Sequence, residues 1–194
     1  MMFVAGLVLF LGVHLLPTRP ALRAKLVALL GDNIYKIAFS LVSLASFLLM
    51  LKGFGEARGA SWNLVIWTPP VWTKHVAFVL MWPAFVLLIG TYVPSHIRMR
   101  AKHPMLAAIK IWALAHLLAN GDLAGMILFA SFLAYGVVDR ISVKKRAPGV
   151  LFAQRAEGWR NDALVLVAGT AAYLVMLYYG HAAWIGVALL PGSA

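Results

Sequence analysis

Long runs of apolar residues, separated by short polar connectors, dominate the chain. The runs are continuous and do not alternate, which is typical of membrane helices and not of strands in a membrane barrel. They predict an all-α fold, a polytopic membrane helix bundle with about six transmembrane helices in a single domain, residues 1–194. The expected spans cover residues 2–16, 34–51, 75–92, 104–119, 123–138 and 162–179.

The segments between the first spans carry their own patterns. Several spans are shorter than the ~20 residues of an upright crossing, so we expect them to thin the bilayer or to borrow flanking residues. Residues 21–30 mix Leu and Val with basic residues and predict a short amphipathic helix at the membrane surface. The Gly-Asp-Asn segment 31–33 predicts a helix end and an N-cap for the second span. Three tryptophans beside a Pro-Pro pair place connector 53–74 at the headgroup level.

Composition supports the membrane assignment. Hydrophobic residues make up 63% of the chain and charged residues 12%, whereas a soluble domain has about 25% charged residues. The chain has no cysteine, which excludes disulfides, iron–sulfur clusters and thiolate-ligated haem. The net charge of +11 comes from short connectors and follows no amphipathic stripe, so we expect contact with anionic lipid and no binding of nucleic acid.

The distribution of Lys and Arg predicts the orientation. The odd-numbered connectors are rich in Lys and Arg. The second connector contributes only Arg58 and Lys74, and the fourth connector contributes no basic residue. Cytoplasmic connectors are enriched in Lys and Arg, so we expect both termini on the outer side. The first apolar block lacks a basic leader and a small-residue cleavage site, so we expect it to remain as a helix. The basic residues of the odd connectors are Arg19, Arg23, Lys25, Arg98, Arg100, Lys102, Arg140, Lys144, Lys145, Arg146, Arg155 and Arg160.

Ionisable residues at membrane depth are costly, and the fourth span holds three of them, His103, Lys110 and His116. On one helix His116 lies ~20 Å from His103 and is rotated by ~140°, so the two cannot bind one metal ion. Trp112 and Asn120 flank His116 at i−4 and i+4. His116 is then either a packing residue that bonds to a neighbouring helix or an axial ligand of haem iron, oriented by Asn120 or Asp122.

The other candidates lie nearer the membrane surfaces. His14 stands near the end of the first span, and His75 and His181 stand at interfaces, where packing or snorkelling explains them equally well. His96 follows Pro94 in a basic connector and is expected to be solvated. Lys110 is expected to snorkel to the cytoplasmic face, or with neighbouring basic residues to meet a haem propionate or a phospholipid headgroup. Those neighbours are Arg98, Arg100 and Lys102.

Several motifs together resemble the NnrU family. They are Gly-Val-His ending at His14, the block 35–44, His-Pro-Met-Leu from His103, and the segment 112–122, which contains His-Leu-Leu-Ala-Asn-Gly-Asp from His116. The resemblance covers nearly the whole chain. It implies a bacterial inner-membrane protein linked to nitrogen-oxide metabolism and denitrification, in a family that includes the zeta-carotene isomerase, which uses haem b to isomerise a cis double bond of a polyene.

The resemblance also implies a set of site residues. His14 and His116 correspond to the haem ligands, and His103 to a further functional histidine. The isomerase carries a cysteine before its helical histidine, and Ala113 stands in that place here. The orientation above puts His14 near the cytoplasmic face and His116 toward the outer one, which requires a tilted haem. If the haem stands upright, His75 or His181 matches the height of His116 better.

Two other functions stay open at this point. A membrane methyltransferase of the isoprenylcysteine type also has a basic residue, His and Pro at a cytoplasmic mouth, and Lys102, His103 and Pro104 would meet the carboxylate of S-adenosylmethionine. The expected acidic partner after this motif is missing. The third possibility is a non-enzymatic accessory subunit of denitrification proteins.

Overall fold

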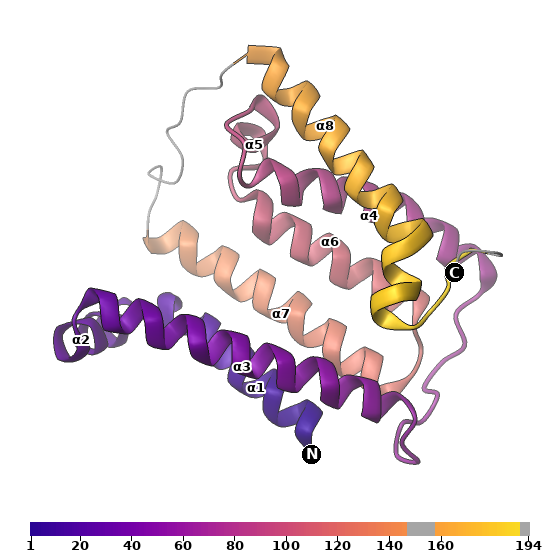
Figure 1. Cartoon of the computed structure of the whole chain (residues 1–194), viewed down its shortest axis with the longest axis horizontal. Coiled ribbons are helices and arrows are strands. Elements are labelled where there is room, and N and C mark those ends of the chain that lie inside the picture. The colour runs from indigo at the N-terminus through magenta and orange to yellow at the C-terminus, as the bar shows by residue number, and fades with distance from the viewer. Residues whose placement is uncertain (147–157, 191–194) are drawn as a thin grey trace. The chain divides into compact units, whose positions relative to one another are not determined.

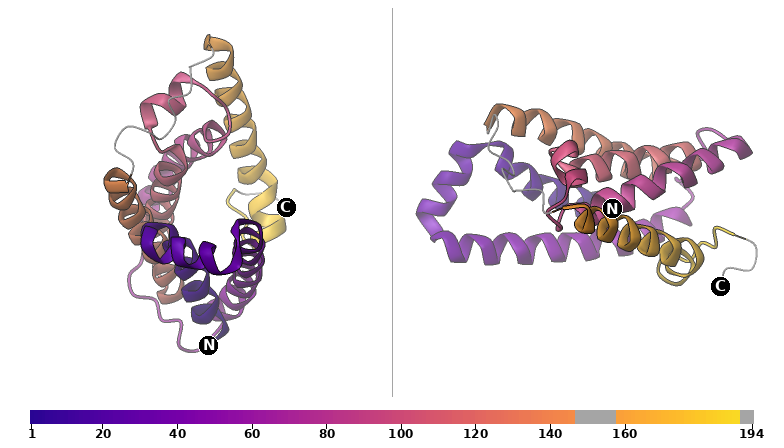
Figure 2. Two further views of the ribbon diagram at one scale, coloured as in Figure 1. Left: turned by 90° about the vertical axis from the view of Figure 1, so that its left-hand side faces the viewer. Right: turned by 90° about the horizontal axis from the view of Figure 1, so that it is seen from above.

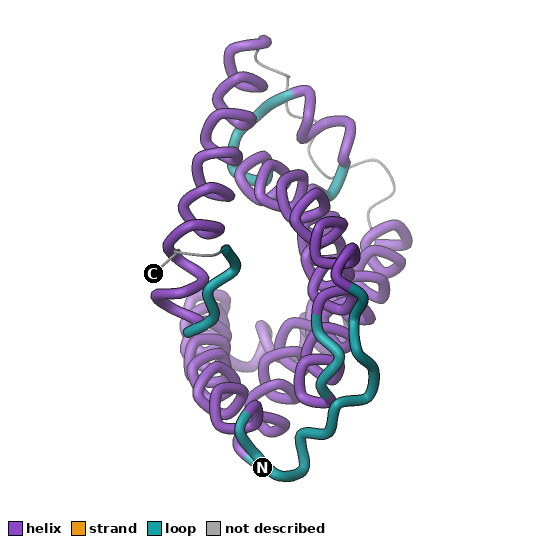
Figure 3. The backbone as a smooth tube through the Cα atoms, turned by 90° about the vertical axis from the view of Figure 1, so that its right-hand side faces the viewer, coloured by secondary structure: helices purple, strands orange, loops and turns teal. Residues whose placement is uncertain are grey.

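The computed structural model describes residues 1–146 and 158–190 (Figure 1). Within them the chain is helical, without a β-strand (Figure 3). The one isolated β-bridge of the described residues joins Val65 and Asp122. The predicted all-α fold is therefore confirmed. The α-helices are α1 Met2–Leu15, α2 Pro20–Leu30, α3 Asp32–Arg58, α4 Val71–Gly90, α5 His96–Ala101, α6 Pro104–Ala119, α7 Leu123–Arg146 and α8 Gly158–Val175. A 3₁₀ turn, Leu16–Thr18, follows α1, and a π-helix, Met176–Ile185, continues α8.

The number of membrane-crossing helices is lower than the six predicted. Four described helices are long and apolar enough to cross: α3, α4, α7 and the continuous helix Gly158–Ile185. A fifth span results if α1 and α2, which are bent by 98°, count as one broken span. The difference lies in α1 with 14 residues and α6 with 16. They extend about 21 Å and 24 Å, less than the ~30 Å hydrocarbon layer. The protein is a multi-pass membrane protein with apolar helices in lipid.

The chain divides into two compact units. Unit 1 contains Met1–Pro69 and Asn120–Arg146, and unit 2 contains Pro70–Ala119 and the described residues after 157. Unit 1 therefore holds α1, α2, α3 and α7, and unit 2 holds α4, α5, α6, α8 and the π-helix. The division matters for function because His14 belongs to unit 1 and His116 to unit 2. The surroundings of each histidine are therefore described within its own unit.

In unit 1, α1 and α3 pack together through two glycines. A Cβ atom on Gly6 would lie 2.4 Å from the backbone nitrogen of Met50, and one on Gly53 would lie 2.3 Å from that of Phe3. Residue 3 meets 53 and residue 6 meets 50, so the two helices are antiparallel. Small residues allow this close approach between helices in a membrane, where burial from water does not drive association.

Helix α2 links α1 to α3 at one end, as the base of a U (Figure 2, right). The predicted helix over 21–30 is thus confirmed as Pro20–Leu30, and none of its residues is buried. The guanidinium of Arg23 lies 5.5 Å from the centre of the Tyr35 ring of α3. Gly31, at φ 78°, is the N-cap of α3 and makes no side-chain cap. Asp32 instead pairs with Lys36 at 2.5 Å.

In unit 2, α4 packs against both α6 and α8. A Cβ atom on Gly169 of α8 would lie 2.7 Å from the Cα atom of Val86 of α4, so the backbones of these helices nearly touch. Two hydrogen bonds hold the same pair of helices. The indole of Trp82 donates to the Thr170 hydroxyl at 3.0 Å, and the Tyr173 hydroxyl donates to a carbonyl of α4 at 3.2 Å. Unit 2 is thus organised around α4.

Candidate functional site

His14 lies in the last turn of α1, half-buried in unit 1. Its Nδ1 atom is 2.7 Å from the backbone carbonyl of Phe10, one turn earlier. A carbonyl oxygen can only accept, so Nδ1 carries the hydrogen and donates it. In the neutral imidazole the lone pair is then on Nε2, the atom that a metal would bind. The hydrogen bond also restrains the ring against rotation.

The surroundings of His14 are aromatic. The ring centre of Phe10 lies 4.2 Å away, that of Phe39 5.4 Å and that of Tyr135 6.3 Å. These residues come from α1, α3 and α7, so three of the four α-helices of unit 1 each contribute a ring. Tyr135 is nearly perpendicular to His14, with an interplanar angle of 88°. The imidazole is therefore held in an apolar environment of the kind that surrounds haem ligands.

His116 repeats the arrangement of His14 on α6 in unit 2. Its Nδ1 atom is 2.8 Å from the backbone carbonyl of Trp112, again one turn earlier. The same reasoning puts the hydrogen on Nδ1 and the lone pair on Nε2. The rings of Trp112 and His116 lie 5.1 Å apart. Both histidines predicted as ligands thus have the same tautomer and an aromatic residue at i−4.

Another histidine of unit 2, His181, lies within electrostatic range of His116. His181 belongs to the π-helix, a rare conformation that often occurs at functional sites. It interacts electrostatically with His116. Its Nδ1 donates to the carbonyl of Val187 at 2.7 Å. The sequence offered His181 and His75 as alternatives to His14. His75 is exposed in the first turn of α4.

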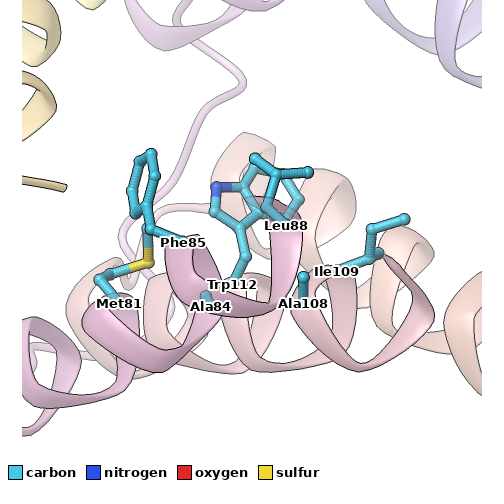
Figure 4. Close-up of a pocket in the computed structure, with 7 residues that line it drawn as sticks. All are labelled: Met81, Ala84, Phe85, Leu88, Ala108, Ile109 and Trp112. Atoms are coloured by element: carbon cyan, nitrogen blue, oxygen red, sulfur yellow. The ribbon is translucent and has the colours of Figure 1, made fainter. Parts of the chain in front are cut away.

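An apolar pocket of about 230 Å³ adjoins Trp112 between α4 and α6 (Figure 4). It is smaller than the ~300–1,000 Å³ of a typical small-molecule site, so it would hold only part of a larger ligand. Trp112 both lines the pocket and contacts His116, and it thereby joins the two. The lining residues are Met81, Ala84, Phe85 and Leu88 of α4 and Ala108, Ile109 and Trp112 of α6.

The basic residues predicted to meet an anion lie between α4 and α6. Arg98 is buried on α5, with 8% of its surface exposed, whereas Arg100 is exposed. Lys102 ends α5 in the left-handed region, at φ 59°. His103 is half-buried, and its backbone N–H donates to the carbonyl of Ala101 at 2.6 Å. Lys110 is half-buried on α6. Four of these residues thus lie within the six positions 98–103, in α5 and the linker after it, and Lys110 lies about two turns further on in α6.

Asn120 and Asp122 belong to unit 1, and their segment makes structural contacts there. The carboxylate of Asp122 accepts the backbone N–H of Gly125 at 2.9 Å and so caps α7. The carbonyl of Gly121 accepts the N–H of Ile66 at 2.8 Å. A Cβ atom on Gly121 would lie 1.8 Å from the carbonyl oxygen of Trp67, so only glycine fits there. The sequence did not predict these contacts, and a role for Asn120 or Asp122 beside haem stays a prediction.

The expectation of a solvated His96 is wrong. His96 begins α5, and its Nδ1 donates to Asp162 Oδ2 of α8 at 2.6 Å. The other oxygen of Asp162 accepts the N–H of Ile97 at 3.1 Å. Asp162 is 5% exposed, and the ring of Trp159 lies 5.2 Å from that of His96. The sequence signal was the carboxylate itself, because an acid at the start of an apolar span needs a partner.

No group of three or more His, Cys, Asp or Glu side chains in residues 1–146 and 158–190 is placed to hold a metal ion. Haem requires fewer protein ligands because the porphyrin supplies four nitrogens to the iron. One or two imidazoles are enough. The restrained histidines of the two units suit this cofactor, and the absence of cysteine leaves imidazole as the donor for its iron.

Comparison with known proteins shows the family of the chain. The family model described as NnrU protein matches residues 2–189 of the chain. No curated protein and no solved structure matches the chain significantly. The match takes in all described helices and nearly the whole length. The chain is therefore a multi-pass membrane protein that belongs to the NnrU family.

Proposed function

We propose that this protein binds haem b in the membrane and that the imidazoles of His14 and His116 would hold its iron. The observation that carries the proposal is the geometry that the two side chains share. Each donates Nδ1–H to the carbonyl of an aromatic residue one turn earlier, at 2.7 and 2.8 Å. Histidines that bind metals typically make such a bond, because it fixes the tautomer and the ring orientation and makes Nε2 more basic.

The basic turn before α6 has a place in this proposal. Haem b carries two propionates, and guanidinium groups bind carboxylates strongly. We assign this role to Arg98, Arg100, Lys102 and His103, with Lys110 and its long stem as a further donor. Burial of Arg98 supports the assignment, since a charge shielded from water interacts more strongly with an anion.

A bound haem supplies an iron that exchanges one electron and binds small ligands. The role of the protein is then in nitrogen-oxide metabolism or in the isomerisation of a polyene. The apolar pocket at Trp112 supports an elongated apolar ligand, since its lining offers aromatic and aliphatic groups beside His116. Ala113 excludes a cysteine that exchanges with histidine on the iron. Any isomerisation therefore proceeds without a thiolate switch.

The location that we propose is the bacterial inner membrane, with both termini on the outer side. It is supported by twelve Lys and Arg residues in the odd connectors, counted from the sequence as Arg19, Arg23, Lys25, Arg98, Arg100, Lys102, Arg140, Lys144, Lys145, Arg146, Arg155 and Arg160. This arrangement requires both α1 and α6 to cross a thinned or protein-lined region, because at 14 and 16 residues they are short for lipid of ordinary thickness.

The test is an optical spectrum of the full chain, expressed with ample iron and haem precursor and purified in detergent. We expect a Soret band that sharpens and shifts on reduction. His14→Ala and His116→Ala should each shift the band to a high-spin position or reduce haem content. His75→Ala, a change of an exposed histidine, is the matched control and should leave the spectrum unaltered. A colourless protein overturns the proposal.

A further inference from the structure

The end of α1 that carries His14 is held by donors from α7. The last carbonyls of a helix have no partner within the helix. Here the hydroxyl of Ser142 donates to the carbonyl of Thr18 at 3.3 Å, and Arg146 donates through Nη1 to the carbonyl of Pro17. Both acceptors lie within four residues of His14. The position of this histidine therefore depends on side chains of another helix.

Arg146 is itself fixed by Asp139. Its Nη2 donates to Asp139 Oδ1 at 2.8 Å, and the side chains of the two residues are 25% and 15% exposed. Asp139 lies one turn after Tyr135 on the same face of α7, and its carboxylate interacts electrostatically with the phenol. Residues 135, 139, 142 and 146 are spaced by four, three and four, so they share one face of α7.

The series returns to His14 through the ring of Tyr135. This ring lies 6.3 Å from the imidazole at 88°, in the range and orientation of an edge-to-face pair. A closed series of contacts results. His14 contacts Tyr135, Tyr135 interacts electrostatically with Asp139 one turn later, Asp139 pairs with Arg146, and Arg146 donates to Pro17, three residues after His14. The bond from Nδ1 to Phe10 restrains the imidazole from one side, and Tyr135 restrains it from another.

We propose that Tyr135 is a positioning residue for His14, held in place by Asp139 and Arg146, and that this clamp of three residues sets the plane of the imidazole. The claim that Tyr135 orients His14 toward a metal rests on the haem binding proposed above. The claim that Tyr135 orients the His14 ring concerns this chain alone. The phenol hydroxyl matters because it interacts with Asp139, and the ring matters because it contacts the imidazole.

The experiment compares the full chain with Tyr135→Phe, Asp139→Asn and Asp139→Glu. Tyr173→Phe is the matched control, because it also removes a phenol hydroxyl, but in unit 2. The first measurement is the rate at which diethyl pyrocarbonate modifies His14 in the haem-free protein, followed by peptide mass spectrometry. Tyr135→Phe and Asp139→Asn should raise this rate about fivefold, the factor for about 1 kcal/mol or one hydrogen bond. Asp139→Glu should restore most of the protection, and Tyr173→Phe should match the wild type.

The second measurement is electron paramagnetic resonance of the ferric protein with haem, because the low-spin signal depends on the orientation of the imidazole planes. We expect Tyr135→Phe to shift or broaden the signal with haem content unchanged. Tyr135→Phe is a small change and keeps the ring, so it decides the question if Asp139→Asn does not fold. Wild-type rates and signals in Tyr135→Phe overturn the inference. A wild type without haem overturns the proposed function, and the modification rate still tests the clamp.

Discussion

Asp162 holds His96 across 66 positions of the chain, with 2.6 Å between Asp162 Oδ2 and His96 Nδ1. The same carboxylate accepts the N–H of Ile97 at 3.1 Å, and the amide of Asn161 donates to the carbonyl of Pro94 at 2.7 Å. The start of α8 therefore fixes the turn that carries Arg98, the buried member of the proposed propionate site. This pair links the stability of unit 2 to its proposed chemistry.

Replacing Asp162 by alanine should destabilise the protein by about 1–3 kcal/mol, because the buried N–H of Ile97 and the His96 ring each lose an acceptor. The measurement is the thermal midpoint of the detergent-purified protein. Asp32→Ala is the control. Its ion pair with Lys36 is more than half exposed, so the change should cost less than about 1 kcal/mol. Equal midpoints for the two variants would contradict a supporting role for Asp162.

Gly6→Ala should destabilise unit 1 by about 1–3 kcal/mol, because the new Cβ atom would lie 2.4 Å from a backbone nitrogen of α3 and would force the helices apart. Gly12→Ala is a matched change on the same helix. Nothing lies within 4 Å of its Cβ position, so it should stabilise the helix by about 0.5–1 kcal/mol. Thermal unfolding of both variants should therefore show midpoints that move in opposite directions.

Gly121→Ala should disrupt the start of α7, because its Cβ atom would lie 1.8 Å from the carbonyl oxygen of Trp67. The backbone must shift, and the bond between Gly121 and Ile66 is lost with it. We expect a loss of about 1–3 kcal/mol. Limited proteolysis at the 59–70 linker should become faster. Gly55→Ala on α3 has open space around its Cβ position and serves as the control. Wild-type cleavage of Gly121→Ala would refute the constraint.

Single cysteines will test the orientation without background, because the chain has none of its own. We expect Lys102→Cys to react with an impermeant maleimide only after the membrane is opened. Ser61→Cys, in the exposed connector after α3, should react in intact cells. The reverse pattern would place the basic connectors outside. It would also show that the bias in Lys and Arg does not govern this topology.

Much of the helix pattern was predictable from the sequence, and the ends of the helices were less so. The fourth span was predicted over the residues that form α6, Pro104–Ala119, because proline marks its start and the Asn-Gly-Asp segment follows its end. Helices α3 and α7 were predicted to end at residues 51 and 138 and in fact end at Arg58 and Arg146. Hydropathy marks the part of a helix that lies in lipid, whereas backbone hydrogen bonds continue into charged residues.

At the candidate site, contacts within one helix were predictable from the sequence and contacts between helices were not. The aromatic neighbours of His14 and His116 at i−4 were visible in the sequence because they lie on one helix. The pair of His96 and Asp162 was not, since it joins residues far apart in sequence that only the packing of α5 on α8 brings together. The same is true of Tyr135 and His14. Periodicity reports contacts within a helix, and contacts between helices depend on a register that a single sequence does not reveal.

The bonds between the linker before α4 and the start of α7 have a consequence for how the chain is assembled. Leu64 and Ile66 are joined to Leu123 and Gly121, and Ala124 donates to the side chain of Asn63 at 2.8 Å. The chain thus leaves unit 1 before the segment Pro70–Ala119 and returns to it after that segment at one place, where these hydrogen bonds hold the two strands of chain together. Insertions or deletions inside that segment need not alter the path of α1, α3 and α7.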